Sequence, residues 1–238
     1  MKSDTMRFYN SDDLDLFQFA TNWKKYFSNK ISRHIQGDVL EVGAGIGSNT
    51  KYLIESNPNI KSWTCIEPEK IFIPRIRENL KNLNNNFTIK NTTIKGITGL
   101  YDTIIYLDVL EHIPDTKKEF IEINKRLKSG GKLIILVPAY NFLYNEFDSH
   151  VGHIKRYNKR LLKEELKYKK VKIFYLDSMG FFASLFNKIV LKKNLPSKKN
   201  ILFWDKILIR LSIVTDRLIL NRFGKSLIGI FTKLFSLD

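Results

Sequence analysis

Several features that are common in secreted and membrane proteins are missing from this chain of 238 residues. It has a single cysteine, Cys65, so no disulfide can form within the chain. No run of about eighteen apolar residues occurs, and the best candidate, residues 179–186, is too short to span a bilayer. Residues 1–17 are too acidic and too interrupted for a secretory signal. These absences predict a cytoplasmic protein, with a peripheral position on the inner face of a membrane as the alternative.

Acidic residues are scarce relative to basic ones. The chain has 40 Lys and Arg against 24 Asp and Glu, a net charge of +16. The imbalance lies in residues 151–238, which hold 20 basic and 6 acidic side chains, whereas residues 1–150 hold 20 and 18. A basic region attracts nucleic acid, anionic lipid or a phosphorylated substrate, although compositional drift also explains the excess. Because the lysines are scattered without interleaved aromatic residues, nucleic acid is the weaker alternative.

Short apolar runs alternate with helical stretches, an order typical of an α/β fold with a parallel sheet. The first five runs have the pattern of strands buried on both faces. Seven strands are predicted, at residues 38–42, 62–67, 87–91, 102–108, 132–138, 171–176 and 226–232. Helices are predicted at residues 13–35, 48–56, 74–83, 117–128, 158–168 and 202–220. Gly130 and Gly131 favour a left-handed end to the helix at 117–128.

The first and last predicted helices have strongly apolar faces. In the first, Trp23, Tyr26 and Phe27 suit either a lid over a ligand cleft or simple packing on the edge of the sheet. In the last, an apolar arc faces away from a charged one, and we expect such an arc to pack against the protein core, with membrane contact as the alternative. The arc consists of Phe203, Ile207, Leu211, Val214 and Leu218.

A glycine-rich turn, "EVGAGIG" at residues 41–47, follows the first strand and precedes a helix, the setting in which backbone approaches a ligand closely. A dinucleotide fingerprint needs a third glycine where Ser48 stands, which disfavours an oxidoreductase, and no Gly-Lys-Ser/Thr follows as in a phosphate-binding loop. The second strand ends at Glu67, where a carboxylate can accept hydrogen bonds from both hydroxyls of a ribose. The turn therefore predicts a nucleoside-containing cofactor.

The sequence resembles the class I S-adenosylmethionine-dependent methyltransferases. The residues that carry the resemblance are "EVGAGIG", "CIEPEK", "YDTIIYLDVLEHIPD" and "LKSGGKLIILVPA", which follow one another between residues 40 and 140. The resemblance implies a Rossmann-like seven-stranded sheet whose last strand is antiparallel. Later segments, "YLDSMGFFASLFNKI", "LFWDKI" and "GKSLIGI", resemble a branch of undefined acceptor that is associated with envelope, glycolipid or polysaccharide biosynthesis.

The same resemblance implies S-adenosyl-L-methionine as cofactor and a set of residues that bind it. The glycine turn would lie under its methionine and ribose, with Glu41 near the methionine end and Glu67 on the ribose hydroxyls. A polar residue after the third strand often meets the adenine amine in this family, which makes Asn91 and Thr92 the candidates in place of the usual acid. The full set is Glu41, Gly43, Ala44, Gly45, Gly47, Glu67, Asn91, Thr92, Asp108, Val109 and His112.

Asp108 ends the fourth strand, where the resemblance places it facing the amino group of the cofactor or the site of transfer. Glu111 and His112 follow it closely. A structural hydrogen bond is the favoured role for His112, with catalysis as the alternative. Glu111 has the same two possible roles.

The acceptor is expected beside residues 140–162, because loops at the carboxyl ends of the strands form the binding crevice of an open α/β sheet. A hydroxyl acceptor must lose a proton, and the candidate catalytic residues are His153, His150 and Asp108. The candidate substrate-binding residues are Tyr140, Asp148, Arg156 and Tyr157, with Arg156 as an anion anchor. Packing and capping of the next helix is the structural alternative for this loop. His-x-x-His beside an acid is a weak metal pattern, so no metal site is predicted.

We therefore expect one α/β domain, with a helical lid at residues 1–37, a cofactor-binding core at 38–140, and acceptor-side elements with extra helices at 141–238. The expected activity is methyl transfer from S-adenosylmethionine to a small-molecule or lipid- or sugar-linked acceptor, at oxygen. An RNA methyltransferase is the alternative suggested by charge, although the Asn/Asp-Pro-Pro-Tyr motif of many nitrogen-directed sites is absent after the fourth strand. A non-catalytic protein that binds the cofactor or a partner is the other alternative.

Overall fold

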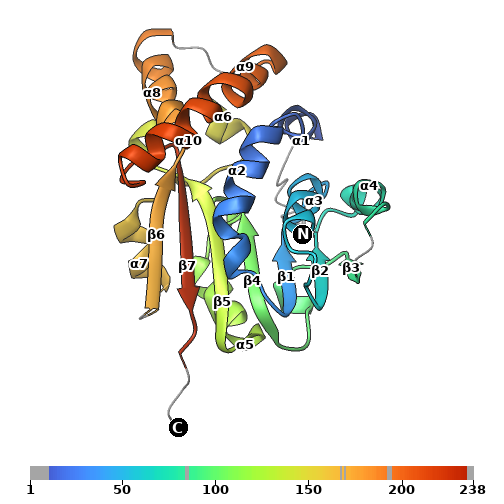
Figure 1. Cartoon of the computed structure of the whole chain (residues 1–238). Coiled ribbons are helices and arrows are strands. Elements are labelled where there is room, and N and C mark those ends of the chain that lie inside the picture. Colours follow the sequence, from blue (N-terminus) through green and yellow to red (C-terminus); the bar gives the residue numbers. More distant parts are fainter. Residues whose placement is uncertain (1–10, 84–85, 167, 169, 192–194, 235–238) are drawn as a thin grey trace, which may run out of the picture.

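The computed structural model describes residues 11–83, 86–166, 168, 170–191 and 195–234. Within them one sheet has the strand order β3-β2-β1-β4-β5-β7-β6 (Figure 1). β7 is antiparallel to both of its neighbours, and the other pairs are parallel. The strands are β1 (Asp38–Val42), β2 (Ser62–Ile66), β3 (Phe87–Lys90), β4 (Tyr101–Leu107), β5 (Leu127–Pro138), β6 (Lys170–Leu176) and β7 (Ser226–Thr232). The predicted seven strands and the antiparallel last strand are confirmed.

Helices cover both faces of this sheet and one of its ends. The first seven are α1 (Ser11–Phe17), α2 (Thr21–Ile31), α3 (Ser48–Glu55), α4 (Ile73–Leu80), α5 (Thr116–Arg126), α6 (Glu146–His150) and α7 (Lys159–Leu166). The others are α8 (Ser178–Phe186), α9 (Lys198–Phe203) and α10 (Ile209–Leu218), with a π-helical turn, Trp204–Leu208, between the last two. We call α8, α9, the π-helical turn and α10 the helical cap, which lies beyond the carboxyl ends of the parallel strands (Figure 1). No helix in the described residues is both long and apolar enough to cross a membrane.

Two apolar cores lie on opposite faces of the sheet, because successive residues of a strand point to opposite sides. Val39 of β1 belongs to the core that α2, α3 and α4 cover, whereas Leu40 belongs to the core that α5 and α7 cover. β3 is an exception to the predicted burial of the first five strands. Its residues are alternately half-buried and exposed, because β3 is the edge strand of the sheet. The central strands thus provide a rigid platform whose carboxyl edge faces the helical cap.

The predicted helix at residues 13–35 is two helices. α2 begins at Thr21 because Asp205, from the cap, accepts hydrogen bonds from the backbone amides of Asn22 (3.1 Å) and Trp23 (2.8 Å). A carboxylate at this place satisfies amides that have no partner within a helix. The capping residue is distant in the sequence, so no local pattern could locate the break.

The strand predicted at residues 132–138 is the end of a longer strand, since α5 stops at Arg126 and β5 begins at Leu127. Gly130 has the expected left-handed φ of 75°, but it lies in the irregular start of β5 and not at the end of the helix. Its amide donates to the carbonyl of Lys233, 2.8 Å away. Backbone pairing with the segment after β7 therefore extends the strand through both glycines.

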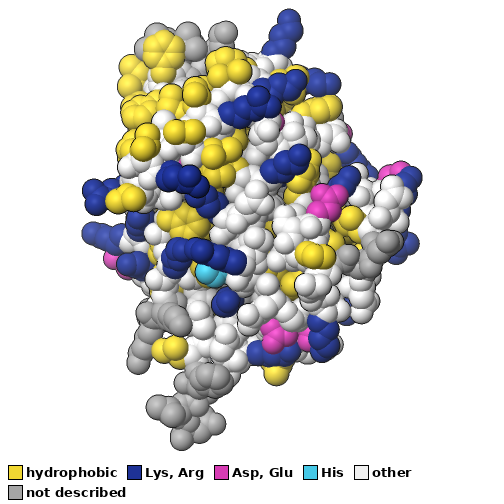
Figure 2. Space-filling view, in the orientation of Figure 1, with side chains coloured by type: hydrophobic (Ala, Val, Ile, Leu, Met, Phe, Trp, Pro, Cys, Tyr) yellow, Lys and Arg dark blue, Asp and Glu magenta, His cyan; other side chains and the backbone are white. Residues whose placement is uncertain are grey.

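The predicted packing of the apolar arc on the last helix is wrong. Its five side chains, from Phe203 to Leu218, are 48–76% exposed, and α10 packs instead through Ile209, Ser212 and Asp216. Asp216 is buried because its carboxylate accepts hydrogen bonds from the Tyr26 hydroxyl and from two backbone amides at the start of α8. Polar partners thus turn the helix so that its apolar arc faces outward. Figure 2 shows hydrophobic side chains gathered over the helical cap.

Candidate functional site

The glycine-rich turn after β1 comes very close to the exit of β4. Gly43, Gly45 and Gly47 have φ values of 71°, 57° and 76°, in the left-handed region that glycine adopts without strain. A Cβ on Gly43 would lie 2.7 Å from Cγ2 of Val109. The Gly43 amide donates to the carbonyl of Ile66 (2.9 Å), which ties the turn to β2. The turn therefore forms a wall of bare backbone where a larger residue does not fit.

Glu67 follows β2 and faces the turn. Its Oε2 accepts a hydrogen bond from the Gly45 amide (2.8 Å), and its Oε1 accepts one from the Glu69 amide (2.9 Å). Burial raises the pKa of Glu67 to about 7, although the two amides act in the opposite direction. Each carboxylate oxygen has a second acceptor position, so this fixed side chain can accept hydrogen bonds from two ligand hydroxyls.

Two other residues implied for the cofactor are engaged within the protein. Glu41 is 2% exposed, and its Oε2 accepts a hydrogen bond from Nε1 of Trp63 (2.9 Å). Burial raises the pKa of Glu41 to about 7. The Asn91 amide donates to the carbonyls of Glu67 and Pro68, both at 2.8 Å. Neither side chain lines the cavity described next, so their roles toward a cofactor stay predictions.

A cavity of about 940 Å³ lies at the carboxyl edge of the sheet. One side is formed by the glycine turn, the ends of β2 and β4, and the loop after β5, and the other side by α1, α2, α8 and α9. The implied cofactor residues that line it are Gly43, Ala44, Gly45, Glu67, Thr92, Asp108, Val109 and His112. Small-molecule sites span roughly 300–1,000 Å³, so this cavity has room for a donor and an acceptor together.

Asp108 lies at the exit of β4 with a φ of 53°, an unusual value for a residue other than glycine. Strained backbone of this kind persists where its surroundings hold it, and here the Asp108 amide donates to the Leu136 carbonyl (2.8 Å). Burial raises the pKa of Asp108 to about 7, while the positive charge of Lys225 acts to lower it. Lys225 also lines the cavity, with its ammonium 4.9 Å from the ring centroid of Trp204. Asp108 and Lys225, whose side chains carry opposite charges when ionised, thus both line the cavity.

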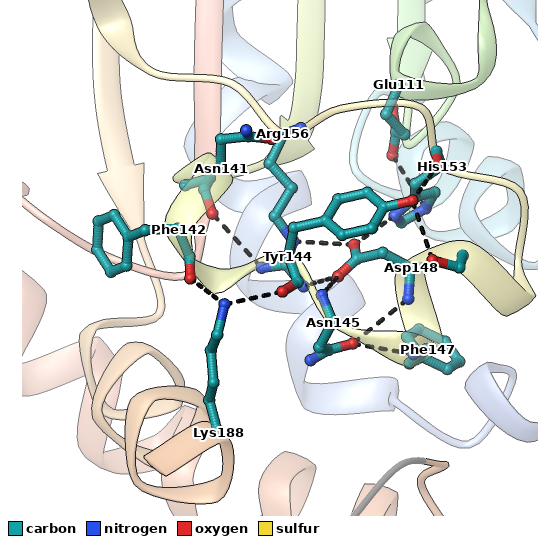
Figure 3. A network of polar contacts seen from close by, with 12 residues as sticks. Glu111, Asn141, Phe142, Tyr144, Asn145, Phe147, Asp148, His153, Arg156 and Lys188 are labelled. Atoms are coloured by element: carbon teal, nitrogen blue, oxygen red, sulfur yellow. Dashed lines mark hydrogen bonds and ion pairs between the residues drawn. The ribbon is translucent and has the colours of Figure 1, made fainter. Parts of the chain in front are cut away.

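The loop after β5 is organised by Asp148, which is fully buried (Figure 3). Arg156 donates to both carboxylate oxygens, from Nε to Oδ1 (2.8 Å) and from a terminal nitrogen to Oδ2 (2.7 Å). The Asn145 amide donates to Oδ2 (2.9 Å), as part of a capping box at the start of α6. Hydrogen bonds from His153 and Arg156 hold the pKa of Asp148 at about 2, against the effect of burial. Asp148 is therefore the ionised centre of a rigid loop.

His153 is positioned by this centre. Its Nδ1 lies 2.7 Å from Oδ1 of Asp148, and because Asp148 is ionised, Nδ1 is the donor. Its Nε2 lies 3.7 Å from Oε1 of Glu111 (Figure 3). The rings of His153 and His112 meet edge to face with their centroids 4.8 Å apart, and Nδ1 of His112 is 3.2 Å from the Gly152 carbonyl oxygen. Burial and His153 lower the pKa of His112 to about 3.

The other predicted acceptor-side residues lie in different surroundings. His150 is exposed and does not line the cavity. Tyr140 stacks on Tyr175 with ring centroids 4.9 Å apart, and Tyr157 is buried with its hydroxyl donating to the Leu110 carbonyl (3.3 Å). Arg156 lines the cavity, but its guanidinium is engaged in an ion pair with Asp148. Of the predicted set, Asp108, Asp148, His153 and Arg156 share the cavity wall.

Lys225 and Trp204 lie in the cavity although neither of them is among the residues that the sequence predicts for the site. A topological signal was available for Lys225, which immediately precedes β7. Because β7 is antiparallel, its first residue pairs with Pro138 at the end of β5. The residue before it must therefore lie at the edge where the parallel strands end. Trp204 had no such signal, because its position depends on how the cap folds back over the sheet.

Residues 40–133 match the family model of a methyltransferase domain. The tRNA U34 carboxymethyltransferase of Nautilia profundicola is 33% identical over 134 residues, which cover 51% of this chain and 42% of that protein. The lovastatin nonaketide synthase of Monascus pilosus is 31% identical over 113 residues, which cover 44% of this chain and 4% of the synthase. This chain therefore spans less than half of the tRNA enzyme and a small fraction of the synthase.

Solved structures share the fold at low sequence identity. A phosphoethanolamine N-methyltransferase of Haemonchus contortus, in complex with phosphomonomethylethanolamine and S-adenosylhomocysteine, aligns with a TM-score of 0.63 and 16% identity over 97% of this chain and 61% of that one. An N-methyltransferase of Bradyrhizobium japonicum WM9 aligns with a TM-score of 0.55 and 14% identity over 91% and 97%.

The domain match, the sheet order and the glycine turn beside Glu67 define a methyltransferase domain. The described residues have the fold of the class I S-adenosylmethionine-dependent methyltransferases, the family that the motifs of the sequence resemble.

Proposed function

We propose that this protein transfers a methyl group from S-adenosylmethionine to an oxygen of a lipid-linked acceptor at an anionic membrane surface. One observation carries the acceptor part of this proposal: the cavity that begins at the glycine turn ends among apolar side chains that are also exposed on the helical cap. The donor and the acceptor would thus occupy opposite halves of one space.

The donor half fits the cofactor in two respects. The missing Cβ at Gly43 lets Val109 pack directly on the backbone of the turn, so the two form a continuous surface for a ligand, and Glu67 presents a fixed carboxylate for the ribose hydroxyls. When bound, the cofactor supplies a methyl group on a sulfonium, which is already activated for transfer. The protein must therefore mainly hold the acceptor oxygen in line with that methyl, and such positioning supplies roughly 7–11 kcal/mol of the barrier.

A hydroxyl acceptor gives up its proton as the oxygen–carbon bond forms, so a proton acceptor is needed at the cavity wall. Asp108 and His153 are the two candidate groups from the sequence that line the cavity without a guanidinium bound to them. Their elements converge on the same corner, because the amide after His153, that of Ile154, donates to the carbonyl of Glu111 (2.8 Å). This corner is where we place the reacting oxygen.

The acceptor half opens through apolar side chains. Phe186, Leu195 and Phe203 line the cavity, and each is 54–58% exposed to solvent. An apolar lining on this side of the cavity suits an acceptor with a hydrocarbon chain, since burial of each CH₂ contributes about 0.8 kcal/mol. A small polar acceptor would gain nothing from this lining.

The outer surface of the cap combines this apolar opening with positive charge. The exposed apolar arc of α9 and α10 lies among exposed lysines and arginines of the same elements (Figure 2). Each such residue near an anionic membrane contributes about 1 kcal/mol, and the apolar arc adds burial among the headgroups. The basic side chains of α9, the π-helical turn and α10 are Lys198, Lys199, Lys206, Arg210 and Arg217.

Incubation with methyl-labelled S-adenosylmethionine tests the proposal. Membrane lipid extract, total RNA and a water-soluble metabolite extract serve as three parallel acceptor pools, with heat-denatured protein as the control. We expect label in the lipid pool, in a product stable to mild base as an ether is. Label in RNA alone would establish the RNA methyltransferase alternative. Cofactor binding without label in any pool would favour the non-catalytic alternative.

A further inference from the structure

Three side chains with metal-binding atoms meet behind the cavity wall. Glu111 and His112 come from the 3-10 turn after β4 (Leu110–His112), and His153 comes from the loop after α6. One ligand atom from each lies within 4.8 Å of the others. The metal pattern considered in the sequence consists only of His150, His153 and Asp148, whereas the fold brings His153 to Glu111 and His112.

Glu111 is the unusual member of this cluster. Its side chain is fully buried, and neither carboxylate oxygen accepts a hydrogen bond. Nε2 of His153, which points toward Glu111 in Figure 3, also has no hydrogen-bond partner. A buried polar atom normally has such a partner, and a buried carboxylate needs a proton or a cation to offset its loss of hydration. The cluster therefore has the composition of a ligand set whose central atom is not part of the polypeptide.

Both imidazoles are oriented by their outer nitrogens. Nδ1 of His153 donates to Asp148, which Arg156 holds in place, and Nδ1 of His112 contacts the Gly152 carbonyl. A metal-ligating histidine typically has its second ring nitrogen bonded to a carboxylate or a backbone carbonyl, because that bond sets the tautomer and the ring orientation. Both kinds of support are present here. The Asp148 network thus acts as the outer layer of a site centred between the two rings.

We propose that Glu111, His112 and His153 bind a divalent transition-metal ion at the wall of the cavity. Two imidazoles and one carboxylate suit Zn²⁺, Mn²⁺, Fe²⁺ or Co²⁺, whereas Ca²⁺ and Mg²⁺ prefer sites made of oxygen. His112 and His153 line the cavity, so an ion that they held would border the acceptor space.

This site would deepen the proposed function, on which its catalytic role rests. A cation in this position binds the acceptor oxygen and lowers the pKa of its hydroxyl. His153 is then a ligand, and the hydroxyl proton passes to another group at the cavity wall, for which Asp108 is the nearest candidate along the chain. The oxygen–hydrogen bond would break, the oxygen–methyl bond would form as the sulfur–methyl bond breaks, and the bonding pair left on sulfur would turn the sulfonium into a neutral thioether. Binding of the ion itself does not depend on this chemistry.

Cobalt titration of the full-length, tag-free protein tests the site. After treatment with a chelator and dialysis, Co²⁺ is added while its visible absorption bands are followed, and Zn²⁺ is then added to displace it. We expect one Co²⁺ per chain with a dissociation constant in the micromolar range or below, and stoichiometric displacement by Zn²⁺. Glu111→Gln and His153→Gln should each weaken Co²⁺ binding at least 10-fold. His150→Gln, an exposed change on the same segment, should stay within 2-fold of the unchanged protein.

Two further measurements separate this proposal from folding and from cofactor binding. Far-ultraviolet circular dichroism and calorimetry with S-adenosylhomocysteine show whether each variant keeps its fold and its donor half. If neither variant folds, the test rests on the unchanged protein. One Co²⁺ bound per chain, with a Tm that rises as the Co²⁺ concentration rises, supports the site. Failure of the unchanged protein to bind one Co²⁺, or equal binding by folded Glu111→Gln and His153→Gln, would overturn the site. S-adenosylhomocysteine binding without metal binding would leave the proposed function standing.

Discussion

The two halves of the cavity are built by different means. The donor half is made largely of backbone, with glycines that turn sharply after β1 and a carboxylate that two amides hold at the end of β2. The acceptor half is made of side chains, with the buried Asp148 network on one side and the apolar helical cap on the other. Backbone geometry is tied to short local motifs, whereas side-chain networks depend on partners from distant segments. The structure of the donor half should therefore be sensitive to added atoms, and that of the acceptor half to the loss of charged groups.

Loss of the Asp148 carboxylate should have the largest effect on stability. Asp148→Ala leaves the guanidinium of Arg156 buried without its partner, which we expect to cost about 3–5 kcal/mol. Chemical denaturation measures this change. The double variant Asp148→Ala with Arg156→Met removes both charges, so its free energy of unfolding should fall clearly less than that of Asp148→Ala alone. Equal losses for the single and double variants would show that the ion pair does not hold the acceptor half together.

A single methyl group should damage the donor half. Gly43→Ala combines a φ of 71° with a Cβ 2.7 Å from Val109, and strain of about 1–3 kcal/mol corresponds to a loss of about 5- to 150-fold in cofactor affinity. Calorimetry with S-adenosylhomocysteine measures it. Gly99→Ala is a matched control, because Gly99 also has a positive φ (94°) but nothing lies near its added Cβ. Similar losses of affinity in both variants would mean that backbone strain, and not the close contact between Gly43 and Val109, controls cofactor affinity.

The pH dependence of cofactor affinity should report on Glu67. Its pKa of about 7 means that the carboxylate gains a proton as the pH falls from 8 to 6, and with it loses an acceptor position for the ribose hydroxyls. We expect S-adenosylhomocysteine to bind about 10-fold more weakly at pH 6 than at pH 8. Glu41 and Asp108 also have pKa values raised to about 7, and both remain in Glu67→Gln. The part of the pH dependence of affinity that is lost in Glu67→Gln belongs to Glu67. If the affinity of this variant changes with pH as much as that of the unchanged protein, Glu67 is not the cause.

Membrane binding through the helical cap should show the smallest change per substitution. Leu211→Ser and Val214→Ser shorten exposed apolar side chains without touching the core, so each should weaken binding to vesicles of anionic lipid a few-fold. Co-sedimentation at low and high salt measures this, and salt should weaken binding of the unchanged protein as well. Ile121→Ser, a change at an exposed residue of α5 outside the cap, is the control. If the protein does not co-sediment with anionic vesicles at low salt, the membrane part of the proposal is wrong.

The same contrast explains what the sequence could predict. The seven strands follow from local apolar runs, and the antiparallel last strand follows from the resemblance of the motifs to the methyltransferase family; the structure confirms both. Gly43 and Glu67 line the cavity, and their roles toward a cofactor stay predictions. The orientation of α10 does not follow, because amphipathicity alone assigns the apolar arc to the core. Asp205 and Asp216 reverse that assignment by binding backbone amides of α2 and α8, and those partners lie far away in the sequence.

The candidate acceptor side was predicted in part for the same reason. Its location after β5 follows from the rule that strand ends form the crevice, and His153 and Asp148 are found there. The separation of the two histidines of this loop could not be predicted. The capping box of α6 directs Asp148 inward and leaves His150 exposed, while His153 turns toward Glu111 from a different element. Contact between residues 42 positions apart has no local signature.

Calorimetric titration of the unchanged protein with S-adenosylmethionine and S-adenosylhomocysteine tests the central claim most directly, since every other role depends on the donor half. We expect one binding site per chain for each ligand, with a dissociation constant in the micromolar range. Adenosine should bind more weakly, because it lacks the methionine part that would lie on the glycine turn. Absence of binding by both ligands to a folded, soluble protein would contradict the account.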